Sequence, residues 1–233
     1  MFFPFYDSTY ILVLIGVIVS MMASAKLNAT YQRYSAVRSM CGLTGAEAAK
    51  RLLNSQGIYD VTIRRVPGSL TDHYDPRSKT VNLSDAVYGS TSIAAIGVAA
   101  HECGHAMQDA ADYSPLRIRA ALVPAANLGS QLAWPLILVG LLLGSGGSGL
   151  AFAGIVLFSL AVLFQLVTLP VEYNASHRAV TLLDSTGILA GQEVGQTRSV
   201  LNAAALTYVA AAAGSILQLL RLLILFGGRR DND

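Results

Sequence analysis

The chain has 233 residues, of which 53% are hydrophobic and only 13% are charged, and its formal net charge is +2. Soluble proteins average about 25% charged residues, so this composition excludes an ordinary soluble domain and indicates membrane segments. The chain has no basic patch interleaved with aromatic residues, so we expect no nucleic-acid partner. Its two cysteines are too few for a disulfide framework.

The first predicted element is an apolar helix from Tyr10 to Ala25. The run Ala23-Ser24-Ala25 looks like a signal-peptidase site, but no Lys or Arg precedes the apolar stretch. This pattern favours an uncleaved anchor over a signal peptide. We therefore expect residues 1–25 to form an N-terminal transmembrane anchor.

Residues 26–120 have the pattern of a small α+β region. Thr44 and Glu47 form a capping box at the start of a helix that Gly57 ends. A turn is predicted at 75–78. Two strands and a longer helix are predicted at Val61–Ile63, Thr80–Leu83 and Ser90–Met107 or slightly beyond.

The last of these helices carries the motif H-E-x-x-H, at positions 101–105. Residues four apart lie on one face of a helix, so His101 and His105 are predicted to bind one Zn²⁺. Glu102 is placed to take a proton from a metal-bound water, whose pKa zinc lowers to about 7. Cys103 faces roughly the opposite way and is predicted to be a small buried side chain. The alternative is a pair of hydrogen-bonded histidines on a buried helix.

Two further apolar spans are predicted at Leu122–Leu143 and Leu150–Leu169, forming a transmembrane hairpin within residues 121–169. A less regular segment, about Ala203–Phe226, is expected to be embedded in the membrane, followed by a basic tail, within 203–233. A full span would place Arg229 and Arg230 outside, against the positive-inside rule, so the alternative is a re-entrant or interfacial helix. Residues 26–119 contain 11 of the 16 Lys and Arg residues. The positive-inside rule therefore predicts that the motif faces the cytoplasm.

Glu172 is the predicted third metal ligand. It lies 67 residues after His105, just beyond an apolar span, in a predicted cytoplasmic helical segment at 170–202 that begins at Pro170. An unpaired carboxylate there is costly, which favours a metal role. The alternative is a carboxylate stabilised by a helix N-terminus. The extended motif with a third histidine is absent, because Ala111 occupies that position.

Further candidates surround this site. His177 and Arg178 follow Glu172 on the same predicted helix and are candidates to stabilise a tetrahedral oxyanion. Asp109 is a candidate to orient a metal-binding imidazole by accepting a hydrogen bond from its other ring nitrogen. An exposed strand edge binds extended peptide by adding a strand to the sheet, and the candidate edge consists of Thr80, Val81, Asn82 and Leu83.

With these motifs the chain resembles the membrane-bound neutral zinc metallopeptidases, a YugP-like family, over nearly its whole length. The resemblance rests on D-H-Y-D-P at 72–76, N-L-S at 82–84, the run at 98–108, L-P-V-E-Y-N-A-S at 169–176 and the run at 203–211. The family implies a prokaryotic integral membrane peptidase. The chain also looks distantly similar to heat-shock and prenyl-protein membrane proteases, in which E-F-x-A-D carries the third ligand. Ser176 here replaces that final Asp, so Ser176 is a candidate to hydrogen-bond a metal-binding side chain without binding the metal itself.

The predicted fold is therefore mainly α, with about four transmembrane or membrane-embedded helices and a small α+β, zincin-like cytoplasmic catalytic region. The predicted function is zinc-dependent endopeptidase activity, with one Zn²⁺ per chain, on membrane-associated polypeptides at the cytoplasmic face of a prokaryotic inner membrane. The alternative is a catalytically silent membrane scaffold or regulator with a structural metal site; a transporter is disfavoured because polar residues lie mostly outside the spans. The substrate and the oligomeric state are not predicted.

Overall fold

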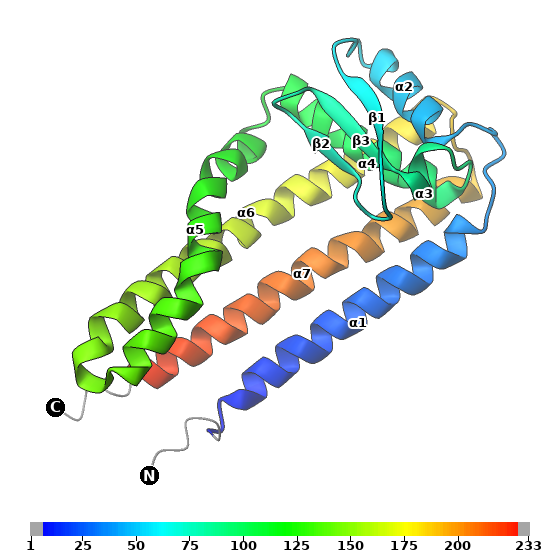
Figure 1. Cartoon of the computed structure of the whole chain (residues 1–233). Coiled ribbons are helices and arrows are strands. Elements are labelled where there is room, and N and C mark those ends of the chain that lie inside the picture. The colour runs from blue at the N-terminus through cyan, green and yellow to red at the C-terminus, as the bar shows by residue number, and fades with distance from the viewer. Residues whose placement is uncertain (1–6, 228–233) are drawn as a thin grey trace. The chain divides into compact units, whose positions relative to one another are not determined.

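The computed structural model describes residues 7–227 and is mostly helical (Figure 1). It divides into two compact units, each described by itself. The first comprises residues 1–23, 117–169 and 207–233, and the second comprises residues 24–116 and 170–206. Four long helices contribute to both units: α1 (Tyr10–Ser35), α5 (Ser114–Leu142), α6 (Ser148–Ser185) and α7 (Gln192–Gly227).

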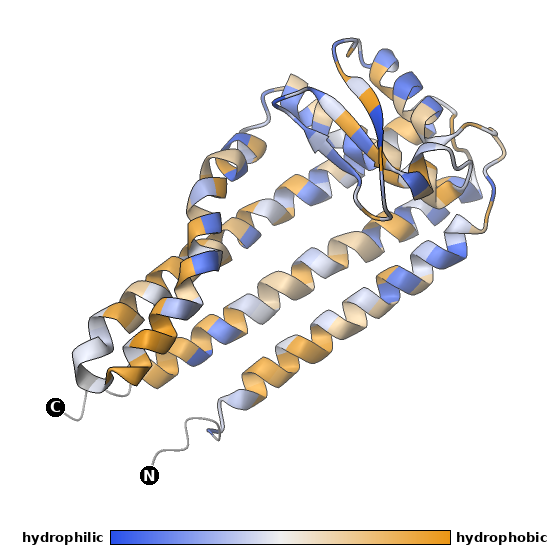
Figure 2. Ribbon diagram, in the orientation of Figure 1, coloured by the Kyte–Doolittle hydropathy of each residue, from blue (hydrophilic) through white to orange (hydrophobic). Residues whose placement is uncertain are grey.

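These four helices are each long and apolar enough to cross a membrane. Their segments in the first unit carry most of the strongly hydrophobic residues (Figure 2). Many large apolar side chains there are exposed, including Met22, Phe152 and Leu223, as expected of surfaces that face lipid. The prediction of about four membrane helices is confirmed as four helices of suitable length and composition. The predicted basic tail falls largely on residues 228–233, outside the described residues.

Small residues let the helices of the first unit approach closely. A Cβ added at Gly129 would lie 2.5 Å from the Leu157 carbonyl oxygen, and one added at Gly16 would lie 3.1 Å from the Gly214 Cα. Gly129 thus joins α5 to α6, and Gly16 joins α1 to α7. Such contacts are typical of membrane helices, whose association depends on close packing rather than on the hydrophobic effect.

The sequence wrongly predicted a helix boundary at Pro170. This residue lies inside α6, which continues unbroken from Ser148 to Ser185. Proline removes one backbone hydrogen bond and clashes with the preceding turn, but membrane helices tolerate this loss. A short 3-10 turn at Gly144–Gly147 connects α5 to α6, where the hairpin connection was predicted.

The second unit combines a three-stranded sheet with short helices (Figure 1). The elements are α2 (Gly45–Ser55), β1 (Thr62–Val66), β2 (His73–Asp75), β3 (Thr80–Ser84), α3 (Asp85–Tyr88) and α4 (Ile93–Ala110). The predicted capping box is present at the start of α2, since Thr44 accepts from the Glu47 N–H and Glu47 accepts from the Thr44 N–H. Fully buried side chains from α2, β3 and α4, such as Leu52, Leu83 and Ile96, pack together in its core.

The sheet corrects the predicted substrate edge. The strand expected at Thr80–Leu83 exists as β3, but it is the central strand, in the order β1-β3-β2. It pairs in parallel with β1 and antiparallel with β2. Thr80, Val81 and Asn82 are therefore paired on both sides and Leu83 is paired with β1, so the predicted segment is not an edge strand. The sequence signal missed β2, a strand of three residues, which covers that side.

Candidate metal centre

The helix that carries the motif is built from small residues and has a defined start. Ser92 caps α4 by accepting a hydrogen bond from the Ala95 N–H. Nearly every residue from Ile93 to Gln108 is buried, so α4 is a core helix. His101 and His105 lie one turn apart on it, as the spacing predicts, and their ring centroids are 4.8 Å apart.

Gly104 allows α6 to lie against the motif. A Cβ at this position would be 2.5 Å from the Ala175 carbonyl oxygen and 3.0 Å from the Ala175 Cα. Any side chain at position 104 would therefore force α6 away from α4. This close approach brings Glu172 and Ser176, one turn apart on α6, within reach of the two imidazoles.

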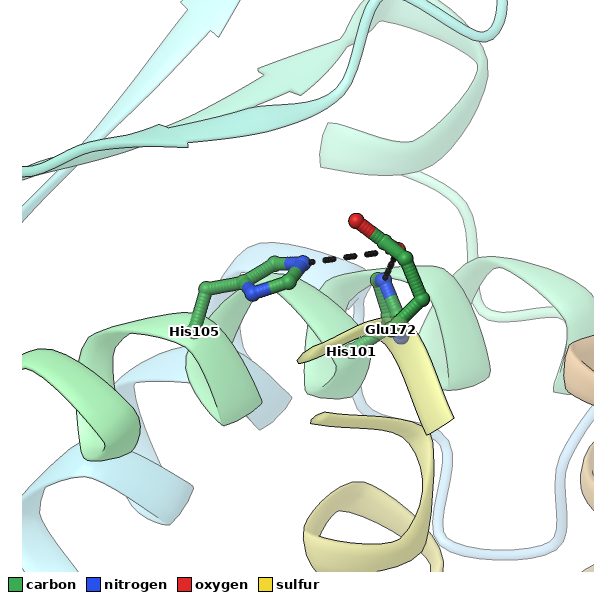
Figure 3. A group of neighbouring side chains, drawn as sticks. All are labelled: His101, His105 and Glu172. Carbon is green, nitrogen blue, oxygen red and sulfur yellow. Dashed lines mark hydrogen bonds and ion pairs between the residues drawn. The ribbon is translucent and has the colours of Figure 1, made fainter. Parts of the chain in front are cut away.

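The side chains of His101, His105 and Glu172 point toward one another (Figure 3). The Glu172 Oε2 lies 3.2 Å from His101 Nε2 and 3.7 Å from His105 Nε2. Donor atoms bound to tetrahedral zinc at about 2.0–2.1 Å are about 3.3 Å from one another. The two distances to Glu172 are close to this separation, and all three donor atoms lie within 4.8 Å of one another, so the group can hold one metal ion after a small closing movement. The donor types are those that zinc prefers.

Each imidazole is also held at its other nitrogen. His101 Nδ1 lies 3.1 Å from the Ser176 hydroxyl, and His105 Nδ1 lies 3.0 Å from Gln108 Oε1. Such contacts fix the orientation of a metal-binding ring and leave Nε2 for the metal. Burial lowers the pKa of His105, but the Glu172 hydrogen bond and the Glu102 and Glu172 carboxylates raise it, and the net shift is upward. The site thus favours positive charge.

Glu102 is buried, with 7% of its surface exposed. Within residues 7–227 its carboxylate has no hydrogen-bonding or ion-pair partner from the protein. Its carboxylate oxygens are not among the buried polar atoms that lack a partner, so they keep contact with solvent beside the two histidines. A carboxylate that is held by no protein group and reaches solvent is placed to act on a water molecule. Cys103 points elsewhere: its thiol donates to the Ala49 carbonyl, and burial raises its pKa well above the usual range.

The other predicted residues lie near the centre but contact different groups. Asp109 accepts a hydrogen bond from the Tyr74 hydroxyl, and Gln108 takes the place behind His105 that was predicted for Asp109. Arg178 donates to Asn174 and lies over the Tyr113 ring. His177 is exposed on α6, and its role in catalysis stays a prediction.

Sequence reasoning missed Gln108 and Asn174. Gln108 is fully buried and joins α4 to α6, because its amide donates to the Val171 carbonyl and to Asn174 Oδ1. One signal was present: Gln108 follows His105 by three residues, on the same helix face, in an otherwise apolar stretch. Asn174 carried no comparable signal.

Two imidazoles and one carboxylate as metal donors, with a second glutamate next to the first histidine to act as a base, are typical of zinc-dependent hydrolases. Residues 9–227 match the family described as "putative neutral zinc metallopeptidase", and the chain belongs to that family. It is 47% identical over 215 residues to the "putative membrane protease YugP" of Bacillus subtilis (strain 168), covering 92% of this chain and 95% of that protein. No solved structure matches the chain. The predicted family resemblance is confirmed.

Proposed function

We propose that this chain is an integral membrane zinc metalloendopeptidase. The observation that carries the proposal is the convergence of His101 Nε2, His105 Nε2 and Glu172 Oε2, with Glu102 on the same helix as the two histidines. The three converging atoms would hold one zinc ion per chain. When bound, zinc supplies Lewis acidity toward a water molecule and toward a substrate carbonyl.

The chain's own residues supply the proton transfers and the positioning. Glu102 accepts a proton from the attacking water at its carboxylate and returns the proton to the leaving amine, as a general base and then a general acid. Ser176 and Gln108 hold the His101 and His105 rings from behind through their Nδ1 atoms. Both rings are thus oriented before substrate binds, so no free energy has to be spent on turning them during the reaction.

Polypeptides at the membrane surface are the proposed substrates. Glu172 follows the apolar stretch that ends at Leu169 by only three residues within the continuous helix α6, and three residues of helix rise about 4.5 Å. The concentration of Lys and Arg in residues 26–119 favours the cytoplasmic face of a prokaryotic inner membrane. Membrane proteins, or peptides associated with the bilayer, fit this position.

A structural metal site would make the chain a scaffold or regulator instead. Structural zinc sites fill four positions with protein ligands. Among residues 7–227, the only cluster of three or more His, Cys, Asp or Glu donors is His101, His105 and Glu172. A fourth position is thus left for water or substrate, which favours the peptidase.

The test uses the full-length protein in detergent, loaded with zinc and then freed of excess metal. The wild type is expected to hold about one zinc and to cleave an unfolded polypeptide such as casein, with cleavage stopped by a chelator. Glu102→Gln is expected to keep the zinc and lose cleavage, whereas Glu172→Ala is expected to lose the zinc. Undiminished cleavage by Glu102→Gln would overturn its role as the base, and full zinc in Glu172→Ala would overturn its role as a ligand.

A further inference from the structure

The hydrogen-bonding partners behind His105 have a defined order of donors and acceptors. The Arg178 guanidinium can only donate, and its Nε donates to Asn174 at 2.8 Å. The Asn174 atom at this point is therefore the amide oxygen. Gln108 contacts the same oxygen at 3.0 Å, so the contacting Gln108 atom must be its amide nitrogen.

A second contact leads to the same orientation. The Gln108 nitrogen also lies 2.8 Å from the Val171 backbone carbonyl, which can only accept. The amide of Gln108 thus has its orientation fixed from two sides, without any hydrogen being seen. Its oxygen, Oε1, must be the atom that faces His105 Nδ1 at 3.0 Å.

The tautomer of His105 follows from this orientation. Because Gln108 Oε1 only accepts, His105 Nδ1 must carry a proton and donate it. In the neutral ring Nε2 then holds a lone pair, and it faces Glu172 Oε2 at 3.7 Å. This separation is longer than a hydrogen bond, so the 3.0 Å contact with Gln108 decides the tautomer, and a bound metal ion would remove the remaining repulsion between the lone pair and the carboxylate.

We propose that Gln108 is a positioning residue for the metal centre, acting in two ways. It fixes His105 in the Nδ1-protonated tautomer that binds metal through Nε2. It also ties α4 to α6 one residue before Glu172, since Val171 accepts its hydrogen bond. Asn174 and Arg178 act behind it by fixing the direction of its amide. This inference rests on the proposed function only in that His105 is a metal ligand.

Ser176 does not have the same control over His101. A hydroxyl both donates and accepts, so the contact of Ser176 with His101 Nδ1 orients the ring without selecting a tautomer. The two ligand histidines therefore differ in the contacts at their Nδ1 atoms, because only the contact with Gln108 selects a tautomer there.

The experiment compares Gln108→Leu, which removes the amide at similar size, with Asn174→Asp, which keeps an acceptor oxygen for both Gln108 and Arg178. Gln196→Leu is the matched control, because it makes the same substitution on α7, in the same unit but outside the network. Zinc affinity is measured by competition with a chromophoric chelator in detergent. Thermal unfolding of the zinc-free proteins shows that each variant is folded.

Loss of a residue that supports a metal ligand typically weakens binding about 10–100-fold, and this is the loss expected for Gln108→Leu. Asn174→Asp and Gln196→Leu are expected to bind zinc with an affinity within about threefold of the wild type, which is small beside the loss expected for Gln108→Leu. Wild-type affinity in Gln108→Leu would overturn the inference. An equal loss in Asn174→Asp would also overturn it, because that variant preserves the order of donors and acceptors.

A second measurement does not depend on any variant. In zinc-free wild-type protein labelled with ¹⁵N-histidine, the His105 nitrogen shifts report the tautomer at a pH where the ring is neutral. We expect protonation at Nδ1, and protonation at Nε2 alone would refute the inference. Zinc binding that depends on Gln108 without any peptide cleavage would leave this inference standing and overturn the proposed function. A wild type that binds no zinc would overturn both.

Discussion

Replacing Gly104 with alanine tests whether helix approach, rather than the motif alone, assembles the metal centre. The new Cβ would lie 2.5 Å from the Ala175 carbonyl oxygen, whereas ordinary contacts are about 3.5 Å. Relieving the clash requires α6 to retreat by about 1 Å, given that contact distance. If the retreat reaches Glu172, its 3.2 Å distance from His101 Nε2 grows well beyond the separation of zinc ligands.

The expected effect on zinc affinity is large and the effect on stability is small. Disturbing the support of a ligand costs about 10–100-fold in metal affinity. Overpacking costs about 1–3 kcal/mol, and the better helix propensity of alanine returns about 1 kcal/mol. Zinc competition and thermal unfolding of the zinc-free protein in detergent measure the two quantities separately.

Gly195→Ala is the matched control for this prediction. Gly195 lies in α7, and a Cβ there would meet nothing within 4 Å. This variant should keep the zinc affinity of the wild type and gain up to about 1 kcal/mol in stability. Normal zinc affinity in Gly104→Ala would refute the argument that this glycine sets the position of Glu172.

Three further predictions concern the rest of the chain. Thr44→Ala should destabilise the protein by about 1 kcal/mol in thermal unfolding, because it removes the cap of α2. The Thr44 backbone and side-chain hydrogen bonds both lower the pKa of Glu47, and the variant loses only the side-chain bond, so only that part of the difference should be present above the ordinary pKa of 4.5 and be lost as the pH falls below it. An iodoacetamide titration should label one thiol in the folded protein and two in the unfolded protein, since Cys41 is exposed while Cys103 is buried with a raised pKa; two labels on folded protein would contradict the burial. Asp7→Ala should lower the thermal midpoint, because it removes the ion-pair partner of the buried Arg221, and adding Arg221→Leu should restore part of the loss; equal midpoints for Asp7→Ala and the double variant would contradict this coupling.

Features set by local sequence were predicted well. The capping box at Thr44 and Glu47 is present, and the strand at Thr80–Leu83 and the helix carrying the motif were found near their predicted ends. The four apolar helices also follow directly from composition. Each of these depends on neighbours in the sequence, through caps, alternation or a long apolar run.

Features set by tertiary contacts were not predictable in the same way. The position of β3 in the middle of the sheet depends on β2, whose three residues are too few to show a period. The continuity of α6 through Pro170 depends on surroundings that a local rule for proline ignores. The positioning role of Gln108 was not predicted, because its partners Val171 and Asn174 lie more than 60 residues away in the chain.

The metal centre also explains why a five-residue motif says more in this chain than its length suggests. H-E-x-x-H places two imidazoles by the periodicity of one helix, but the third ligand depends on how a second helix lies against the first. Two residues of α4 set that arrangement: Gly104 permits the approach of Ala175, and Gln108 binds the Val171 carbonyl. Both lie within three residues of His105, so the stretch from His101 to Gln108 contains two ligands and the contacts that position Glu172. The informative pattern is therefore H-E-x-G-H-x-x-Q, in which the glycine and the glutamine act on the helix that carries the carboxylate.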